Sequence, residues 1–158
     1  MKKVLFLFLA IMIALSSAGF AAVLTSKVAG DSGKMGAGFW GGIPTLRYNF
    51  SNSTQGQLGL SFSSGGGTSI TTLLLGADTD VAKISGTAVN MGGAFYLTSA
   101  AGGSSWTAAL TCGVDAMIAP SVVLELKVYP ITLSGASGGG STTVGILSTA
   151  TVGAHIYL

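Results

Sequence analysis

The chain alternates between apolar residues and small or polar residues, with a period of two, over most of its length. In the segment SWTAALTCGVDAMI (105–118), Leu110 and Val114 fall on one face and Asp115 falls on the other. The same alternation is present in segments 45–50, 57–63, 88–98, 122–133 and 151–158. A period of two is typical of β-strands, and no long stretch has the 3.6-residue period of an amphipathic helix. We therefore expect an all-β fold.

The second face of these strands holds mostly Gly, Ser, Thr and Ala, and the whole chain is only 8% charged. A soluble domain usually carries about a quarter charged residues, and its outer strand face is polar. Small side chains fit the crowded interior of a narrow barrel, and a membrane barrel turns its apolar face outward. Lipid offers no partner for an open sheet edge, so such a sheet must close. The pattern predicts a transmembrane β-barrel, and a soluble secreted β-sandwich stays open as an alternative.

The length accommodates about eight strands in a single antiparallel, up-and-down barrel. We expect strands at 34–41, 43–50, 55–63, 68–77, 84–98, 105–118, 121–134 and 142–158. The connections at 51–54, 78–83 and 119–121 are expected at one end of the barrel. Those at 64–69, 100–105 and 134–142 are expected at the other end. The segment GGIP (41–44) fits either a first hairpin or a bend in one long strand.

The N-terminal segment has the pattern of a secretory signal, which indicates the cellular compartment. Lys2 and Lys3 precede an apolar run over residues 4–15, and small residues follow, with Gly19 and Ala21 at the positions that a signal peptidase reads. The apolar run is too short for a membrane span, which needs about 20 residues. We therefore expect a secretory signal peptide at 1–21 and a barrel domain at 22–158, whose residues 22–33 form a periplasmic leader.

With these features the chain resembles the small eight-stranded outer-membrane β-barrel proteins, the group that includes the OmpA transmembrane domain and OmpW. The resemblance rests on the segment IAPSVVLELKVYP (118–130) and on the C-terminal strand VGAHIYL. In that strand Val152, Ala154, Ile156 and Leu158 occupy every second position, and Leu158 stands where the family usually has Phe. The resemblance implies that these four residues form a signal read by the outer-membrane assembly machinery. It also implies an outer-membrane location.

Residues with catalytic or metal-binding chemistry are scarce. His155 is the single histidine and Cys112 the single cysteine, so a zinc site and a Ser-His-Asp site are not expected. We expect His155 to be packed or hydrogen-bonded, and Cys112 to face lipid. The glycine runs at 64–69 and 134–140 lack the helix and lysine of a phosphate loop. No basic patch favours nucleic acid. The chain is therefore not expected to be an enzyme or to hold a cofactor.

Four charged residues, Arg47, Asp115, Glu125 and Lys127, fall on the face that points into the predicted barrel. Each would need a partner there, because a buried charge is costly unless it is paired. We expect an ion network that plugs the barrel; a charged conduit is the alternative.

An eight-stranded barrel is just wide enough for its own side chains, which disfavours a broad pore. We therefore expect a monomeric, structural outer-membrane protein, with lipid and the assembly machinery as partners. A narrow channel or a carrier for small ions or apolar molecules is the second alternative. The outer loops are short and nearly uncharged, which disfavours a surface-interaction protein.

Overall fold

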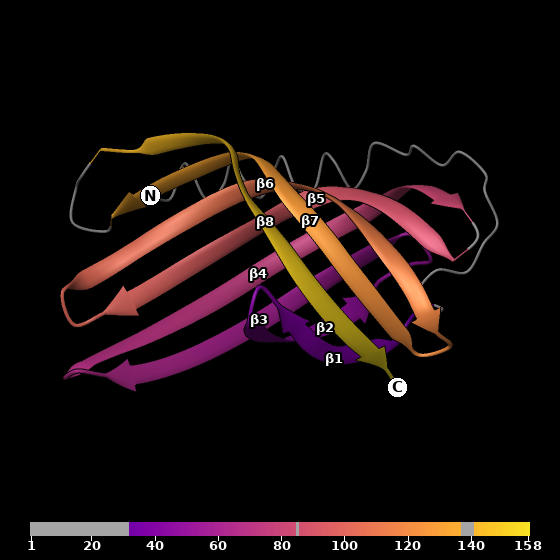
Figure 1. Ribbon diagram of the computed structural model, residues 1–158, viewed down its shortest axis with the longest axis horizontal. Coiled ribbons are helices and arrows are strands. Elements are labelled where there is room, and N and C mark those ends of the chain that lie inside the picture. The colour runs from indigo at the N-terminus through magenta and orange to yellow at the C-terminus, as the bar shows by residue number, and fades with distance from the viewer. Residues whose placement is uncertain (1–31, 85, 137–140) are drawn as a thin grey trace.

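The computed structural model describes residues 32–84, 86–136 and 141–158, which form one closed antiparallel barrel (Figure 1). Its strands are β1 (Met35–Trp40), β2 (Ile43–Asn49), β3 (Thr54–Gly65), β4 (Thr68–Ile84), β5 (Thr87–Ala100), β6 (Gly103–Ala119), β7 (Val122–Ala136) and β8 (Thr143–Tyr157). Each strand pairs with the next, and β8 pairs back with β1. The prediction of an all-β, eight-stranded, up-and-down barrel is confirmed.

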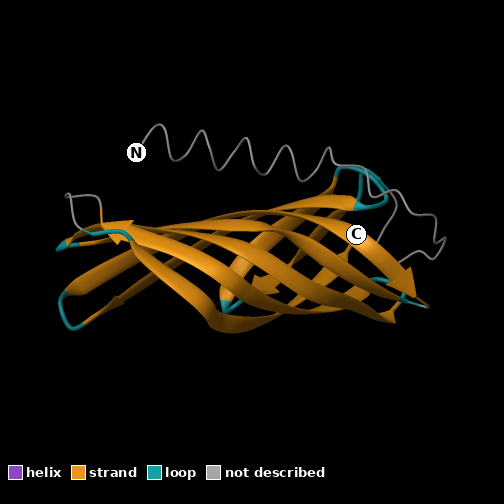
Figure 2. Cartoon of the chain, turned by 90° about the horizontal axis from the view of Figure 1, so that it is seen from above, coloured by secondary structure: helices purple, strands orange, loops and turns teal. Residues whose placement is uncertain are grey.

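The expected signal peptide at 1–21 lies outside the described residues, as does most of the expected leader at 22–33. Within the part of the chain that the structure describes, no helix is long and apolar enough to cross a membrane. Figure 2 shows the described segments as tilted strands joined by short loops.

The two faces of the strands are arranged as the alternation predicts. Large apolar residues such as Phe62, which is 69% exposed, and Leu46, which is 51% exposed, point away from the barrel axis. The buried residues include many polar and charged side chains, and Arg47 is 0% exposed. In most water-soluble domains the charged side chains are exposed and the large apolar side chains are buried.

The segment at 41–44 is a hairpin and not a bend. Gly41 and Gly42 have φ values of +58° and +81°, and Gly66 and Gly67 in the β3–β4 turn have +58° and +80°. Two successive residues with positive φ are what a two-residue hairpin turn requires, and glycine adopts them without steric cost.

The expected connection at 78–83 is wrong. β4 continues to Ile84, with Asp78 opposite Gly92 and Asp80 opposite Asn90, and the ladder shifts by one residue between Asp80 and Ala82. The polar residues suggested a turn, but Asp78 is buried inside the barrel. Its carboxylate points inward because the strand keeps its alternation through this segment.

The barrel wall has unequal height. β1 and β2 have 6 and 7 residues, whereas the other strands have 12 to 17. The β2–β3 ladder ends at the pair Thr45–Gly59, and the β1–β8 ladder ends at Trp40–Gly153. Figure 1 shows the short β1–β2 hairpin beside the longer strands.

Beyond those ladder ends, the described residues of β3 and β8 have a strand partner on one side only. Residues 60–65 of β3 pair with β4, and residues 143–146, 149 and 150 of β8 pair with β7. We call this interval between β3 and β8 the wall opening. We call the end of the barrel that carries the start of β1 and the end of β8 the terminal end, and the opposite end the far end.

Candidate functional site

The centre of the site is Arg47 on β2, which is completely buried. Its Nη2 lies 2.5 Å from Asp115 Oδ2, and its Nη1 donates to Glu125 Oε1. Asp115 on β6 and Glu125 on β7 are directly opposite each other in the β6–β7 ladder. The guanidinium therefore bridges two carboxylates that would otherwise repel each other.

The second cation of the site is Lys127 on β7. Its Nζ donates to the Asp78 carboxylate of β4 and lies 3.6 Å from Glu125 Oε2. The same Nζ lies 4.5 Å from the centroid of the Trp40 ring, which is a cation–π contact. Lys127 thus joins the carboxylates to the aromatic residues further along the barrel.

His155 on β8 also belongs to the site. Its Nδ1 lies 2.7 Å from Glu125 Oε1 without a well-aligned hydrogen bond, and its Nε2 is 2.7 Å from the Thr45 hydroxyl. The three carboxylates of Asp78, Asp115 and Glu125 face two permanent cations.

Neutral side chains surround these charges. Gln55 Nε2 donates to Asp115 Oδ2 at 3.3 Å, Gln57 Nε2 donates to Glu125 Oε2 at 3.3 Å, and the Thr111 hydroxyl donates to Asp78 Oδ1 at 2.9 Å. Such hydrogen bonds offset part of the cost of removing the carboxylates from water. The compensation is incomplete, because Asp115 Oδ1 and Arg47 Nε have no hydrogen-bond partner among the described residues.

Glycines on the inward face make room for the large residues of the site. A Cβ on Gly113 would lie 2.6 Å from Lys127 Cγ, and one on Gly76 would lie 2.8 Å from the Trp40 ring. Both distances are shorter than carbon atoms tolerate. The glycine-rich polar face therefore has a packing reason, since eight strands enclose little space.

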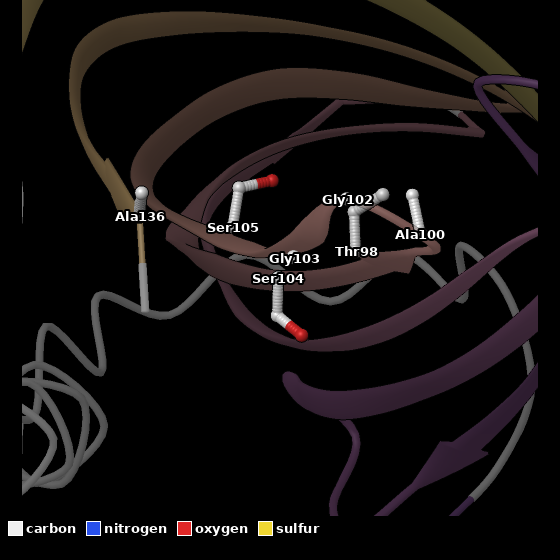
Figure 3. A pocket seen from close by; sticks show the side chains of 7 residues that line it. All are labelled: Thr98, Ala100, Gly102, Gly103, Ser104, Ser105 and Ala136. Atoms are coloured by element: carbon white, nitrogen blue, oxygen red, sulfur yellow. The ribbon is translucent and has the colours of Figure 1, made fainter. Parts of the chain in front are cut away.

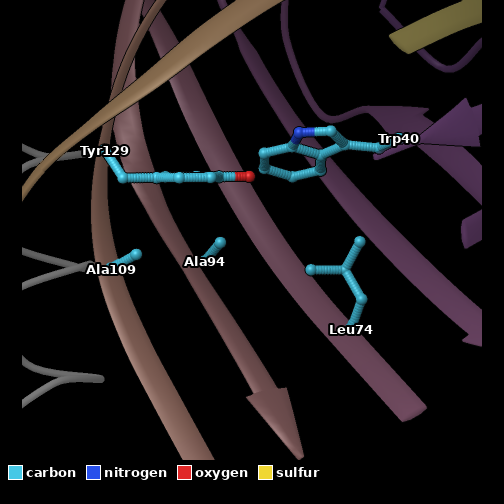
Figure 4. Close-up of a cluster of buried hydrophobic side chains, with 5 residues drawn as sticks. All are labelled: Trp40, Leu74, Ala94, Ala109 and Tyr129. Carbon is cyan, nitrogen blue, oxygen red and sulfur yellow. The ribbon is translucent and has the colours of Figure 1, made fainter. Parts of the chain in front are cut away.

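An aromatic layer lies above the charged site, on the side of the far end. Trp40 Nε1 donates to the Thr151 hydroxyl at 2.6 Å, and the Tyr129 hydroxyl is 3.0 Å from the same oxygen. The Tyr96 hydroxyl is 2.7 Å from that of Tyr129. Trp40 and Tyr129 pack with Leu74, Ala94 and Ala109 in one buried cluster (Figure 4). This layer separates the charged site from the rest of the interior.

The structure brings all four of the expected interior charges together in one network. Asp78 and His155 are additional members. Asp78 was assigned to a turn because its neighbours are polar, yet it continues the inward alternation of β4 through Gly76 and Leu74. His155 was expected to be packed or hydrogen-bonded, and it does contact Thr45. The sequence signal for His155 was its place on the same strand face as Thr151 and Gly153, which is the face that points into the barrel.

The four residues of the expected C-terminal signal end the barrel wall. Ile156 and Ala154 on β8 lie opposite Ala37 and Phe39 on β1, so this segment forms the seam that closes the barrel. Val152 and Ile156 point outward and are exposed, and Leu158 follows the strand. Cys112 also lies on the outer face, between Met91 and Val128.

The site consists of ion pairs and hydrogen bonds between side chains of β2, β4, β6, β7 and β8. Among the described residues, no group of three or more His, Cys, Asp and Glu side chains is placed to hold a metal ion. A scan of protein-family models, a search of curated proteins and a search of solved structures found no match to this chain.

Proposed function

We propose that this chain is an integral outer-membrane β-barrel protein with a structural role, and that the charged network closes its interior to ions. The observation that carries the proposal is the inverted arrangement of the faces. Apolar side chains cover the outside of the barrel, and Arg47, Lys127 and three carboxylates fill its inside. This arrangement is typical of membrane barrels.

The dimensions support a membrane location. A strand crosses a bilayer with about 9–11 residues, and β3 to β8 have 12 to 17. Tyr48 and Phe50 make an edge-to-face contact near the terminal end, on the outer surface. Phe62 on β3 and Trp106 on β6 lie toward the far end. Aromatic residues at two levels match the girdles of outer-membrane barrels.

The network favours a closed barrel over an ion channel. The side chains of Arg47, Glu125, Lys127 and Asp78 are completely buried, and Asp115 is nearly so. Groups that line a water-filled path stay hydrated, and pairs between them contribute little to stability. Dry, mutually paired groups instead act as a plug.

We also propose the partners, the oligomeric state and the orientation of the barrel. The partners are the outer-membrane lipids and the assembly machinery, which reads Val152, Ala154, Ile156 and Leu158, and the barrel works as a monomer without catalysis. The terminal end then faces the periplasm and the far end faces outward.

Two measurements test the proposal. Fractionation of expressing cells should place the protein in the outer membrane, where it should migrate differently on gels with and without heating. The purified barrel should show no steady single-channel current in planar bilayers. Recovery from the soluble periplasm would contradict the membrane location. A stable conductance whose cation preference disappears in Glu125→Ala would contradict the plug.

A further inference from the structure

One ion pair of the charged network joins two strands across the barrel interior and is completely buried. Lys127 on β7 donates from Nζ to the carboxylate of Asp78 on β4, and both side chains are 0% exposed. The strands β4 and β7 do not pair with each other, so the two residues meet only through the interior. An amine that is held in contact with a carboxyl group, away from water, has the proximity that formation of an amide bond requires.

The surroundings of this pair are packed. The centroid of the Trp40 ring lies 4.5 Å from Lys127 Nζ, and Leu74, which is 0% exposed, lies on the same inward face of β4 as Asp78. A cavity of about 340 Å³ lies elsewhere, at the far end of the barrel (Figure 3). Its lining is Thr98, Ala100, Gly102, Gly103, Ser104, Ser105 and Ala136. The amine and the carboxyl group therefore face each other in the filled part of the interior.

A second carboxylate is placed to transfer protons to and from this pair. Glu125, the only glutamate of the chain, has Oε2 at 3.6 Å from Lys127 Nζ. Its Oε1 accepts a hydrogen bond from Arg47. One oxygen of Glu125 is thus held by the guanidinium, and the other is directed towards the amine. A carboxylate in this position can act as a general base and then as a general acid.

The carboxyl group of Asp78 has a hydrogen-bond donor at each oxygen. Oδ2 accepts from Lys127, and Oδ1 accepts from the Thr111 hydroxyl at 2.9 Å. When an amine adds to a carboxyl carbon, negative charge develops on the oxygen that stays, and a donor already in place stabilises that charge. An amine, a proton acceptor and an oxyanion donor therefore surround one carbon atom, Asp78 Cγ.

We propose that Lys127 and Asp78 form an intramolecular amide bond, with the release of one water molecule, which links β4 to β7 through the barrel interior. A proton first moves from the Lys127 ammonium to Asp78 Oδ2, because a neutral amine and a neutral acid cost less than two separate charges in a site without water. Nζ then attacks Asp78 Cγ, and Glu125 accepts the proton that the nitrogen loses. As the Cγ–Oδ2 bond breaks, Glu125 returns this proton to Oδ2, which leaves as water.

The reaction is balanced by the pair itself. One ammonium and one carboxylate yield one amide and one water molecule, and Glu125 ends as the carboxylate that it was at the start. The bond replaces a buried ion pair by a neutral group. It fixes two non-adjacent strands covalently at the level of the plug.

A second lysine–aspartate pair provides an internal comparison. Lys83 Nζ lies 3.0 Å from Asp80 Oδ2 on the same strand, with side chains that are 13% and 7% exposed. Lys83 also donates to the backbone carbonyl of Asn52 in the turn at the terminal end. Because water reaches this pair, it should stay an ordinary ion pair.

The mass of the protein before and after folding tests the bond. Asp78 and Lys127 are 49 residues apart, so they come together only in the folded barrel. Full-length protein dissolved in urea should have the mass of its sequence, and the same protein should be lighter by one water molecule after refolding. Trypsin should then cleave after Lys83 but not after Lys127, so that residues 48–83 stay joined to residues 84–158. Protein purified from the membranes of expressing cells should give the same two results.

Three variants separate the roles of the residues. Lys127→Arg keeps a cation beside Asp78 but removes the amine, and it should retain the full mass. Glu125→Gln keeps the size of the side chain but cannot accept the proton, and it should also retain the full mass while Lys127 and Asp78 are still present. Lys83→Arg is the matched control, and it should lose one water molecule as the wild type does. Gel shift on heating shows which variants are folded.

A wild-type barrel that shows the gel shift and has the unchanged mass would overturn the bond. A loss of water that maps to peptides without Asp78 and Lys127 would do the same. An equal loss of water in Glu125→Gln would exclude the proton transfer by Glu125. The wild-type measurement stands alone if a variant does not fold, and it requires only the folded barrel. Its result is therefore independent of the membrane location and of the conductance.

Discussion

Asp115 and Glu125 face each other directly across the β6–β7 ladder, and the guanidinium of Arg47 reaches both carboxylates from β2 on another side of the barrel. Two carboxylates in register repel each other unless a cation lies between them. The β6–β7 pairing at this level therefore depends on a residue from a strand that neighbours neither β6 nor β7.

Arg47→Met should consequently destabilise the barrel strongly. Removal of one partner from a buried ion pair costs about 3–5 kcal/mol, and here the loss leaves two opposed carboxylates. Glu125→Ala should cost less, because Asp78 and Asp115 remain as partners for the two cations. Urea unfolding of the refolded barrel, followed by tryptophan fluorescence, measures both effects. Equal midpoints for wild type and Arg47→Met would show that the network does not hold the barrel together.

The last strand should be indispensable for insertion. Deletion of residues 151–158 removes the whole β1–β8 seam, which spans Gly153 to Tyr157. Ile156→Asp places a charge on the outer face, where Arg or Lys at the bilayer midplane costs about 2–4 kcal/mol and an acid costs less. We expect loss of the heat-dependent gel shift for the deletion and a reduced inserted fraction for Ile156→Asp. A truncated protein that still shows the gel shift would mean that β8 is not the closing strand.

The β1–β8 seam should also have no room for a side chain at position 38. Gly38 lies opposite His155, and a Cβ at this position would collide with the Ala154 carbonyl oxygen and the backbone of His155. Gly38→Val should therefore prevent β1 from pairing with β8. Ala37→Val is the control, because Ala37 neighbours Gly38 on β1 and points outward. Gel-shift assays of the two variants compare them; a folded Gly38→Val barrel would require a different register at the seam.

Reagents that label thiols should distinguish the surfaces. Cys112 lies on the outer face among apolar neighbours, and a hydrophilic maleimide should not label it in intact vesicles. In a Cys112→Ala background, Ser64→Cys near the β3–β4 turn should react on whole cells, and Asn52→Cys at the terminal end should react only after the outer membrane is permeabilised. Ready labelling of Cys112 would favour the soluble β-sandwich. Reversed accessibility at Ser64 and Asn52 would instead reverse the orientation.

Local residue order is enough to predict the strands and their two faces. The period of two assigns Leu46, Leu58 and Leu126 to one face and Arg47, Gln57 and Lys127 to the other, and the structure has each on the expected side. Glycine pairs such as Gly66–Gly67 locate turns for the same local reason, because few other residues adopt positive φ twice in succession. These properties depend on neighbours a few residues apart.

Only the closed barrel decides which inward residues meet and where the wall is incomplete. Asp78 and Lys127 are 49 residues apart and lie on strands that do not pair, so their contact depends on the tilt and stagger of the whole sheet. The same applies to His155 and Thr45, which are 110 residues apart. The wall opening follows from the shortness of β1 and β2 relative to β3 and β8. A strand pattern read along the chain predicts the face of each residue, whereas partners across the interior are set by closure.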